Sequence, residues 1–518
     1  MKEDDFMNLE NVLENVEIIK KVNFKDIDIT NISSDSRSIK ENGLFFAISG
    51  FVKKGTDFIP SALEKGASAI VVEENTNISE LNVSENIPVV AVKNIRHALA
   101  IASCNLFDNP SKKLKLIGVT GTKGKTTSTF MLKSILMAHG LNVGLIGSIA
   151  VYINDKQLEI TDRTTPESFK IQEYLAKMVD ENVDVAIVEV SSQAMKLDRV
   201  TGCNFDYALF TNLSEDHISP NEHADMQDYF EAKLSLMKLC PNLTINLDNE
   251  YTAKVPKLLP SKNITTFGIA TPNCDVSATD IKLANAYSDF TLVIGNSHEP
   301  VRVSIPGEYM VYNAIGAIAV AKNFNVTADE IRSALSNVKV FGRSELVPNK
   351  LGLTILIDYA HTPASLESIL KTVKPYTKGK VICTWGVGGD RDTAKRPIMG
   401  EISGTLADFT VLTSDQVRTE NPMKILKEIE VGLKKSKGDY ILILNRTEAI
   451  RYALSIMTKD DILVIPGLGN DLYIEYMGVK YPYDERIIIN GIIEEMLDEN
   501  FDVNSLRNFD NSSFKIPS

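Results

Sequence analysis

Short apolar runs alternate along most of the chain with longer stretches in which apolar residues recur every three or four positions. Residues 115–120, KLIGVT, form one such run, and residues 125–139 carry Phe130, Met131 and Ile135 on one stripe. The run predicts a buried strand, and the stripe predicts a helix. Further strands are predicted at Val185–Val190, Tyr207–Thr211, Leu243–Asn246, Thr354–Ile357, Lys380–Thr384, Phe409–Thr413 and Ile462–Ile465. This alternation is typical of largely parallel sheets with helices on both faces.

The length of the chain and the spacing of these runs indicate three domains. A chain of 518 residues is too long for one hydrophobic core. Residues 1–110 predict a small mixed α/β domain, residues 111–340 a central domain with a mainly parallel sheet, and residues 341–499 a Rossmann-like domain. Residues 500–518 are polar and are expected to form a loosely attached tail. The expected fold class is therefore α/β.

The charge balance argues against a general nucleic-acid-binding surface. The chain has 55 Lys and Arg against 68 Asp and Glu, which gives a formal net charge of −13. The sequence contains no apolar run of membrane-spanning length, and its acidic N-terminus lacks the core of a signal peptide. The five cysteines are scattered, which favours reduced and mostly buried thiols. A cytoplasmic protein is expected.

Residues 118–129, GVTGTKGKTTST, join the first predicted strand to the first predicted helix and form a candidate phosphate-binding loop. The general template places a glycine five residues before Gly124, where this chain has Val119. Strand, glycine turn and helix nevertheless present backbone N–H groups and the positive end of the helix dipole to an anion. Lys125 adds a positive charge, and the Thr126 hydroxyl is a ligand for Mg²⁺. The alternative, a turn that binds nothing, is the weaker interpretation.

Charged side chains also follow other predicted strands, where α/β proteins build their sites. Glu189 ends the strand at 185–190, where a carboxylate faces the metal ion of a phosphate loop. His217 lies in the acidic turn after the next strand, and Lys233 lies on an apolar helix further along. Taken singly, His217 would pass as a structural histidine and Lys233 as a surface lysine.

The predicted third domain carries two further groups of polar residues. Arg343 and Asp358 are placed to reach a nucleotide from another domain, as arginines do that stabilise a transferred phosphoryl group. Three turns, GGDRD at 388–392, DQVR at 415–418 and GLGND at 467–471, follow strands of one sheet. Arg fits a carboxylate and Asp fits an ammonium, so a small zwitterionic ligand is expected there. Ordinary polar turns remain the alternative for each stretch alone.

Together these motifs resemble those of the Mur ligase family, most closely the MurE type, which adds the third amino acid of the bacterial cell-wall stem peptide. The resemblance covers nearly the whole chain. It rests on SSDSR with Ser36-Arg37, GTKGKTT, TTPES at 164–168, EVSS at 189–192, TNLSEDH at 211–217, EAK at 231–233, YNA at 312–314, GR at 342–343, DYAHTP at 358–363 and GGDRD. Ten motifs in the same order make coincidence negligible.

The resemblance implies a role for each motif. ATP would be bound by Gly121, Thr122, Lys123, Gly124, Lys125, Thr126, Thr127, Asn313, Arg343 and Asp358. The UDP-linked peptide would be bound by Ser36, Thr164, Thr165, Ser191 and Arg199. The amino acid would be bound by Arg391, Asp415, Gln416, Arg418, Gly467 and Asp471. The catalytic set would be Lys125, Glu189, His217 and Lys233.

The resemblance also implies two Mg²⁺ ions and a modified lysine. Thr126 and Glu189 would hold one ion, and His217 and Lys233 the other. Lys233 would carry CO₂ as a carbamate, because a bare ammonium beside Mg²⁺ would be repelled whereas the adduct is an anionic oxygen ligand.

The implied enzyme is a monomeric, ATP-dependent amide-bond-forming ligase of peptidoglycan precursor synthesis. ATP would phosphorylate a carboxylate of UDP-N-acetylmuramoyl-L-alanyl-D-glutamate, and a free diamino acid would attack the acyl phosphate. Domain closure would exclude water. One alternative is a folylpolyglutamate synthetase, which lacks a UDP-binding first domain and the TTPES and GGDRD stretches. Another is a non-catalytic or side-pathway homologue.

Departures from the family pattern bear on the choice of amine. Gln193 stands where MurE-type enzymes usually have His. The Asp-Asn-Pro-Arg motif of diaminopimelate-adding members is Asp-Gln-Val-Arg at 415–418, and Gly-Lys-Gly-His-Glu is Gly-Leu-Gly-Asn-Asp at 467–471. Arg418 favours meso-2,6-diaminopimelate, because lysine-adding members lack this arginine and a buried cation facing an ammonium is costly. Val417 and the shorter Asp471 leave L-lysine or an unusual diamino acid open.

Overall fold

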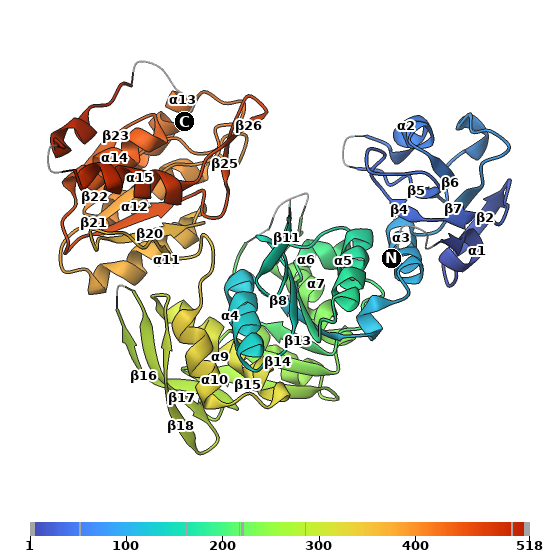
Figure 1. The fold of residues 1–518 in the computed structure, drawn as a ribbon, viewed down its shortest axis with the longest axis horizontal. Coiled ribbons are helices and arrows are strands. Elements are labelled where there is room, and N and C mark those ends of the chain that lie inside the picture. Colours follow the sequence, from blue (N-terminus) through green and yellow to red (C-terminus); the bar gives the residue numbers. More distant parts are fainter. Residues whose placement is uncertain are drawn as a thin grey trace. The chain divides into compact units, whose positions relative to one another are not determined.

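The computed structural model describes residues 6–50, 53–161, 163–216, 218, 222–284, 286–498 and 501–511. They form two compact units. Figure 1 labels their helices and strands. The first unit takes the chain up to Ser277 together with Ile315–Ile331, and the second takes Ala278–Ala314 and the chain from Arg332 onward. Short 3₁₀ helices lie at Gly55–Phe58, Ile78–Glu80, Pro110–Lys112, Thr252–Lys254, Lys322–Phe324, Lys374–Tyr376 and Val503–Arg507.

The N-terminal part of the first unit is a mixed α/β layer. Its five-stranded sheet has the order β2 (Ile18–Val22), β7 (Val89–Val92), β6 (Ala67–Glu73), β5 (Gly43–Phe46) and β4 (Asn31–Ser33). All neighbours are parallel except β2 and β7. Helices α1 (Leu9–Val12), α2 (Ile59–Glu64) and α3 (Ile95–Leu106) accompany it, and β1 (Met7–Asn8) pairs with β3 (Asp28–Ile29). The mixed α/β prediction is confirmed here.

A larger sheet forms the centre of the first unit. Its order is β11 (Lys156–Ile160), β10 (Ala150–Ile153), β9 (Val143–Ile146), β12 (Val185–Glu189), β8 (Lys115–Thr120), β13 (Tyr207–Phe210), β14 (Asn242–Asn246) and β15 (Asn263–Gly268), followed by the first residues of β16 (Val276–Leu283). In the sheet, β9, β12, β8, β13, β14 and β15 are neighbours in that order, and all of them are parallel. Strands β10 and β11 form an antiparallel hairpin. The carboxyl ends of β8, β12 and β13 therefore meet at one edge, as the alternating pattern predicts.

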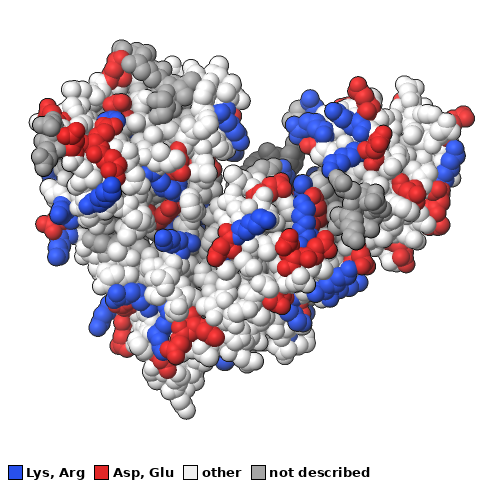
Figure 2. Space-filling view, in the orientation of Figure 1, with Lys and Arg blue, Asp and Glu red and all other residues white. Residues whose placement is uncertain are grey.

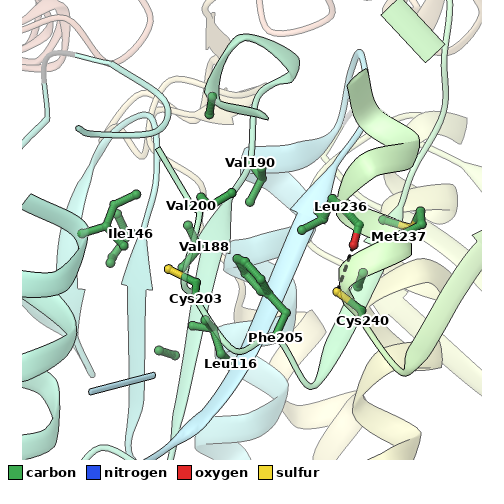
Figure 3. Close-up of a cluster of buried hydrophobic side chains, with 14 of the residues drawn as sticks. Leu116, Ile146, Val188, Val190, Val200, Cys203, Phe205, Leu236, Met237 and Cys240 are labelled. Carbon is green, nitrogen blue, oxygen red and sulfur yellow. Dashed lines mark hydrogen bonds between the residues drawn. The ribbon is translucent and has the colours of Figure 1, made fainter. Parts of the chain in front are cut away.

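Apolar side chains from strands of the large sheet and from several helices of this unit pack into a core cluster, part of which Figure 3 shows. The helices are α4 (Lys125–Ala138), α5 (Ser168–Asp180), α6 (Ser192–Lys196), α7 (Met226–Leu239) and α8 (Val255–Leu258). Leu116 of β8 and Val188 of β12 lie in this core with Leu236 and Met237 of α7. Cys240 follows α7, and its thiol bonds to the Leu236 carbonyl (3.2 Å). All five cysteines are free thiols and four are buried, as predicted.

The second unit contains a second parallel sheet. Its order is β19 (Glu345–Leu346), β20 (Thr354–Asp358), β24 (Ile462–Pro466), β21 (Val381–Trp385), β22 (Phe409–Leu412) and β23 (Tyr440–Leu442), with only β19 antiparallel. Buried apolar clusters lie on both faces, under α11 (Pro363–Val373), α12 (Lys395–Leu406), α13 (Pro422–Ser436), α14 (Arg446–Ile456) and α15 (Glu485–Met496). A hairpin, β25 (Tyr473–Tyr476) and β26 (Val479–Pro482), stands beside the sheet.

The remaining elements follow β16 along the chain. Strands β17 (Ser288–Ile294) and β18 (Ser297–Val303) form an antiparallel hairpin, and helices α9 (Glu308–Ala321) and α10 (Ala328–Asn337) follow. Each strand predicted from an apolar run is present to within one residue at either end. The prediction of a loosely attached tail is wrong for its described part. Leu506 is buried, Arg507 donates to the Ser455 carbonyl (3.1 Å) and Asn511 to the Leu442 carbonyl (2.7 Å).

The surface carries charges of both signs. Lys and Arg side chains are interspersed with Asp and Glu side chains on the face shown in Figure 2. Among the described residues, no helix combines the length and the apolar character that crossing a membrane requires.

Candidate active site

The candidate phosphate-binding loop lies between β8 and α4, and its backbone requires glycine. Gly121 has a φ of 149° and Gly124 a φ of 84°. A Cβ on Gly121 would also lie 1.9 Å from Oγ1 of Thr211. The Lys125 ammonium donates hydrogen bonds to the carbonyl oxygens of Gly121 (2.9 Å) and Thr122 (3.1 Å). The loop thus holds its lysine at the N-terminus of α4, where N–H groups and the helix dipole attract anions.

The turn after β13 braces this loop, because β8 and β13 are adjacent parallel strands. Thr211 Oγ1 donates to the Lys123 carbonyl (2.8 Å), and the Lys123 N–H donates to Asn212 Oδ1 (3.0 Å). The Lys123 ammonium pairs with Asp216 (3.0 Å). His217, predicted in this turn as a metal ligand and catalytic residue, lies outside the described residues.

Glu189 is fully buried at the end of β12, beside the loop. Its carboxylate accepts hydrogen bonds from Thr126 Oγ1 (3.0 Å), Ser148 N–H (3.1 Å) and Ser148 Oγ (3.0 Å). Burial raises the pKa of Glu189, whereas the Lys125 ammonium and these donors lower it. A Cβ on Gly147 would lie 2.2 Å from the carboxylate, so this approach also requires glycine. The structure therefore brings Thr126 and Glu189 together.

Lys233 lies on α7 and is 1% exposed, which excludes the interpretation as a surface lysine. Its Nζ donates a hydrogen bond to the Gly121 carbonyl (2.9 Å) and lies 4.7 Å above the centre of the Tyr229 ring. Burial and the nearby Lys125 ammonium lower the pKa of Lys233 well below its usual value. Two lysines from different helices therefore donate to the same carbonyl oxygen of the loop.

Four of the residues predicted to bind the UDP-linked peptide lie around the end of β12, close to Glu189. The Thr165 hydroxyl donates to the last carbonyl of β12 (2.7 Å) and accepts from the Ser191 N–H (3.0 Å). Arg199 donates from Nη1 to the Thr165 carbonyl (3.1 Å), and Thr164 Oγ1 accepts from the Ser148 hydroxyl (3.0 Å). The Arg199 Nε is buried without a hydrogen-bond partner among the described residues. An orphaned buried donor of this kind points to a ligand or water as its partner.

Glu167 lies within ion-pair distance of three arginines beside this group. The distances are 2.9 Å to Arg163, 3.1 Å to Arg199 and 3.5 Å to Arg96 of α3. The Arg96 contact links the N-terminal layer to the central sheet. Ser36, the fifth predicted residue, is buried in the N-terminal layer, and none of its contacts in the described part of the chain reaches this group.

Three residues predicted to contact ATP lie in the second unit, on or beside β20 and on α9. The Asp358 carboxylate accepts a hydrogen bond from the Ser344 N–H (2.6 Å), and burial raises its pKa. The Arg343 guanidinium lies 4.5 Å over the Tyr359 ring. Asn313 is buried on α9. Their contact with ATP stays a prediction.

Asp415 follows β22 and carries a buried carboxylate. Its Oδ1 accepts a hydrogen bond from the next N–H in the chain (2.6 Å). Its Oδ2 has no hydrogen-bond partner within the described residues and lies 3.8 Å from a guanidinium nitrogen of Arg446. A Cβ on Gly467 would lie 2.2 Å from this oxygen, so the glycine leaves it space. Such an oxygen is an acceptor for an ammonium group of a ligand.

Gln416 and Arg418 join the same loop to its neighbours. The Gln416 Nε2 donates to the Tyr473 carbonyl (3.0 Å) and to Asp471 Oδ2 (3.3 Å). The Arg418 Nη1 donates to the carbonyl of Gly389 (2.7 Å). The structure thereby brings the three turns 388–392, 415–418 and 467–471 together. Among the predicted residues of these turns, Arg391 is exposed, and none of its contacts in the described part of the chain joins it to the others.

Three family models match the chain over consecutive ranges. The model described as the Mur ligase family catalytic domain matches residues 28–105, the Mur ligase middle domain 119–321, and the Mur ligase glutamate ligase domain 342–469. The chain belongs to the Mur ligase family.

Relatives of this Mur ligase match it over nearly its whole length. A curated relative from Clostridium tetani (strain Massachusetts / E88), named UDP-N-acetylmuramoyl-L-alanyl-D-glutamate--2,6-diaminopimelate ligase, is 42% identical over 93% of this chain and 99% of its own. A solved structure of an enzyme with that name is 26% identical, covers 95% of this chain and 99% of its own, and has a TM-score of 0.67. MurF from Thermotoga maritima in complex with ADP (18% identical, 90% and 98% covered, TM-score 0.61) shares the fold.

Three residues of this Mur ligase shape the site although no sequence motif identified them. Ser148 holds the buried carboxylate of β12, and it follows β9, so the strand-end rule would have found it. Arg446 is fully buried and donates to the carbonyls of Ser414 (3.2 Å) and Pro466 (3.1 Å), which joins the ends of β22 and β24. Glu475 lies on the β25–β26 hairpin, beside the 415–418 loop.

Proposed function

We propose that this Mur ligase is an ATP-dependent enzyme that joins an amino acid to UDP-N-acetylmuramoyl-L-alanyl-D-glutamate in peptidoglycan precursor synthesis, as a cytoplasmic monomer. One observation carries the proposal. Lys125, Lys233 and the Thr126–Glu189 pair meet at a glycine loop in a chain 42% identical to a relative named for this reaction. The intact set also argues against a non-catalytic homologue.

ATP would serve as the phosphoryl donor. The bond between the γ-phosphorus and the ADP oxygen would break, and a bond from that phosphorus to a carboxylate oxygen of the UDP-linked peptide would form. The amine would then attack the acyl carbon, phosphate would leave with the carboxylate oxygen, and the amine proton would pass to solvent. Lys125 and the loop N–H groups would stabilise the charge on the phosphoryl oxygens.

The residues around the loop fit a Mg²⁺ ion that binds together with ATP. Thr126 Oγ1 and Glu189 offer a hydroxyl and a carboxylate 3.0 Å apart. Mg²⁺ prefers oxygen ligands and usually binds through one or two carboxylates together with substrate phosphates and water. When bound, it would offset negative charge on the transferred phosphoryl group. A second ion at His217 and Lys233 would need the His217 side chain, which lies outside the described residues.

Lys233 would carry a carbamate. The neutral form of an amine is the form that reacts with CO₂, and the burial and neighbouring Lys125 charge that lower the pKa of Lys233 favour that form. The adduct would replace a cation with an anionic oxygen ligand next to the phosphate loop.

The amine would be meso-2,6-diaminopimelate, and the relative's name gives 2,6-diaminopimelate. Asp415 has an oxygen without a hydrogen bond from the described residues, which suits an ammonium. Arg418 on the same loop carries a guanidinium, which suits a carboxylate of the ligand. L-Lysine or an unusual diamino acid is the alternative within the same reaction.

Release of phosphate tests the proposed function. Full-length protein would be incubated with ATP, Mg²⁺, the UDP-linked dipeptide and, in turn, meso-diaminopimelate, L-lysine and L-ornithine. We expect the fastest release with meso-diaminopimelate. A mixture without the UDP-linked dipeptide measures background ATP hydrolysis. Release at that background rate with every amine would overturn the proposal.

A further inference from the structure

An ion pair stands in the proposed amine site that no motif predicted. The Arg418 Nε lies 3.6 Å from Oε2 of Glu475, and the two side chains are 24% and 25% exposed. The Glu475 carboxylate comes from β25, whereas Arg418 belongs to the loop after β22. The Glu475 carboxylate therefore pairs with the same guanidinium that a carboxylate of the ligand would contact.

The backbone of Glu475 is fixed to that loop on both sides. Its N–H donates to Oε1 of Gln416 (2.6 Å), and its carbonyl accepts from the Arg418 N–H (3.0 Å). The Met477 N–H donates to the Arg418 carbonyl (2.7 Å). Gln416 reaches one methylene further than the Asn of the family motif, and its amide also bonds to the Tyr473 carbonyl. This departure from the motif thus ties the hairpin to the loop and sets the position of Glu475.

The Arg418 guanidinium keeps one edge for a ligand. Its Nη1 is bonded to the Gly389 carbonyl (2.7 Å), and its Nε faces Glu475. Its Nη2 makes no hydrogen bond to any residue that the structure describes. A carboxylate of a ligand has a donor at Nη2, and an ammonium of the same ligand has an acceptor in the Glu475 carboxylate.

We propose that Glu475 is a specificity-determining residue of the amine site, which sets the charge that the distal end of the incoming amino acid can carry. This inference rests on the proposed ligase function and extends it to the choice of amine. A lone Arg418 would favour a bare distal carboxylate and repel a distal ammonium. The Arg418–Glu475 pair has no net charge, so it fits a distal end that carries both groups, as meso-diaminopimelate does. It also weakens the rejection of lysine that Arg418 alone would cause.

Three acceptors that differ in the charge of the distal end test this inference. L-Lysine ends in a cation, meso-diaminopimelate in a zwitterion, and L-2-aminopimelate in an anion. Glu475→Gln removes one negative charge and keeps the size of the side chain. Relative to meso-diaminopimelate, we expect kcat/KM for lysine to fall about fivefold and kcat/KM for 2-aminopimelate to rise about fivefold.

A matched variant controls for the loss of an ion pair elsewhere in the same unit. Glu495 on α15 pairs with Arg451 on α14 (2.7 Å), and Glu495→Gln is expected to leave both ratios unchanged. Gln416→Asn, which shortens the tie to the hairpin, should shift both ratios in the same directions as Glu475→Gln. If Glu475→Gln instead changes kcat/KM by the same factor for all three acceptors, the loop has lost order and the charge role is wrong.

Direct binding separates this inference from the proposed function. Calorimetry on the full-length protein with a non-hydrolysable ATP analogue measures the dissociation constant of each acceptor without turnover. If none of the three acceptors makes the parent protein release phosphate above background, the ligase proposal fails. Binding constants that shift in the expected order in Glu475→Gln would still support the charge role. Binding constants that do not shift would overturn it.

Discussion

At the scale of single residues, the candidate active site contains two lysines that donate to the same carbonyl oxygen. Lys125 and Lys233 each donate to the Gly121 carbonyl at 2.9 Å. Lys125 begins α4 at the edge of the loop, where a phosphate can neutralise it. Lys233 is enclosed on α7, so burial and the first cation both oppose its charge, and its pKa falls. The same residue type therefore stands in two electrostatic environments, one at a helix N-terminus and one enclosed beside a second cation.

The carbamate proposal predicts a specific rescue. Lys233→Ala should lower kcat about 100-fold or more, because the site loses an anionic ligand near the transferred phosphoryl group. Added acetate or formate should restore part of the activity by supplying a carboxylate in the space that the variant opens. Lys238→Ala, an exposed position on the same helix, is the control. Activity of Lys233→Ala equal to that of the parent would contradict the assignment.

The sequence predicts the residues that stand in motifs and misses those that come from distant segments. The positions of Glu189 and Lys233 follow from a strand end and a helix read through the family pattern. The sequence assigns Arg418 as an unpaired cation facing the substrate, whereas the structure pairs it with Glu475. That pairing depends on the register between a hairpin and a loop, which local patterns do not contain.

At the scale of elements, buried hydrogen bonds hold the strand ends that carry the proposed amine site. Arg446 on α14 donates to the carbonyls after β22 and at the end of β24, and to Glu485 at the start of α15 (2.7 Å). Both side chains of the pair are fully enclosed, at 0% and 1% exposure. Such a pair fixes geometry, and its loss is costly because a charge remains buried without a partner.

Arg446→Met should therefore lower the free energy of unfolding of this part of the chain by about 3–5 kcal/mol. Trp385 is the only tryptophan of the chain and is buried in β21, so its fluorescence in a urea titration follows this sheet. Arg446→Met combined with Glu485→Gln should recover part of the loss. Arg451→Met, at a partly exposed pair on the same helix, should cost about 1 kcal/mol or less. Equal effects of the two single variants would contradict the argument.

Strands in the parallel sheets were predictable as elements, but the β25–β26 hairpin was not. Parallel strands are apolar on both faces and so read as continuous runs. The hairpin turns through Met477 and Gly478, which have φ values of 50° and 76°. Such two-residue turns usually contain Asn-Gly or Asp-Gly, so a methionine in the first position gives no local signal.

At the scale of the whole molecule, the residues assigned to ATP are divided between the two units. The glycine loop belongs to the first unit, and Arg343 and Asp358 belong to the second. Hydrogen bonds within each unit fix each group separately. The role proposed for Arg343, stabilising the transferred phosphoryl group, concerns the chemical step rather than the binding of the nucleotide.

Arg343→Ala should slow the chemical step much more than it weakens nucleotide binding. We expect kcat to fall about 1,000-fold, as for other arginines that stabilise a transferred phosphoryl group, with the dissociation constant for ATP changed less than about threefold. Single-turnover kinetics and equilibrium nucleotide binding measure the two quantities. Arg302→Ala, an exposed arginine paired with Asp289 in the same unit, is the control. If ATP binding and turnover fall by the same factor, Arg343 binds ATP itself and does not act specifically on the transferred phosphoryl group.

The residues proposed to select the amine and the residues of the glycine loop lie in different units, which has a consequence for how such an enzyme can diverge. The tie from Gln416 to the hairpin, the Arg418–Glu475 pair and the Asp415 carboxylate all lie in the second unit, whereas Lys125, Glu189 and Lys233 lie in the first. Under the proposed roles, a substitution that alters the choice of amine would not remove a residue that acts in phosphoryl transfer. Substitutions in the β25–β26 hairpin would then change the amine that is used and leave the residues of the glycine loop as they are.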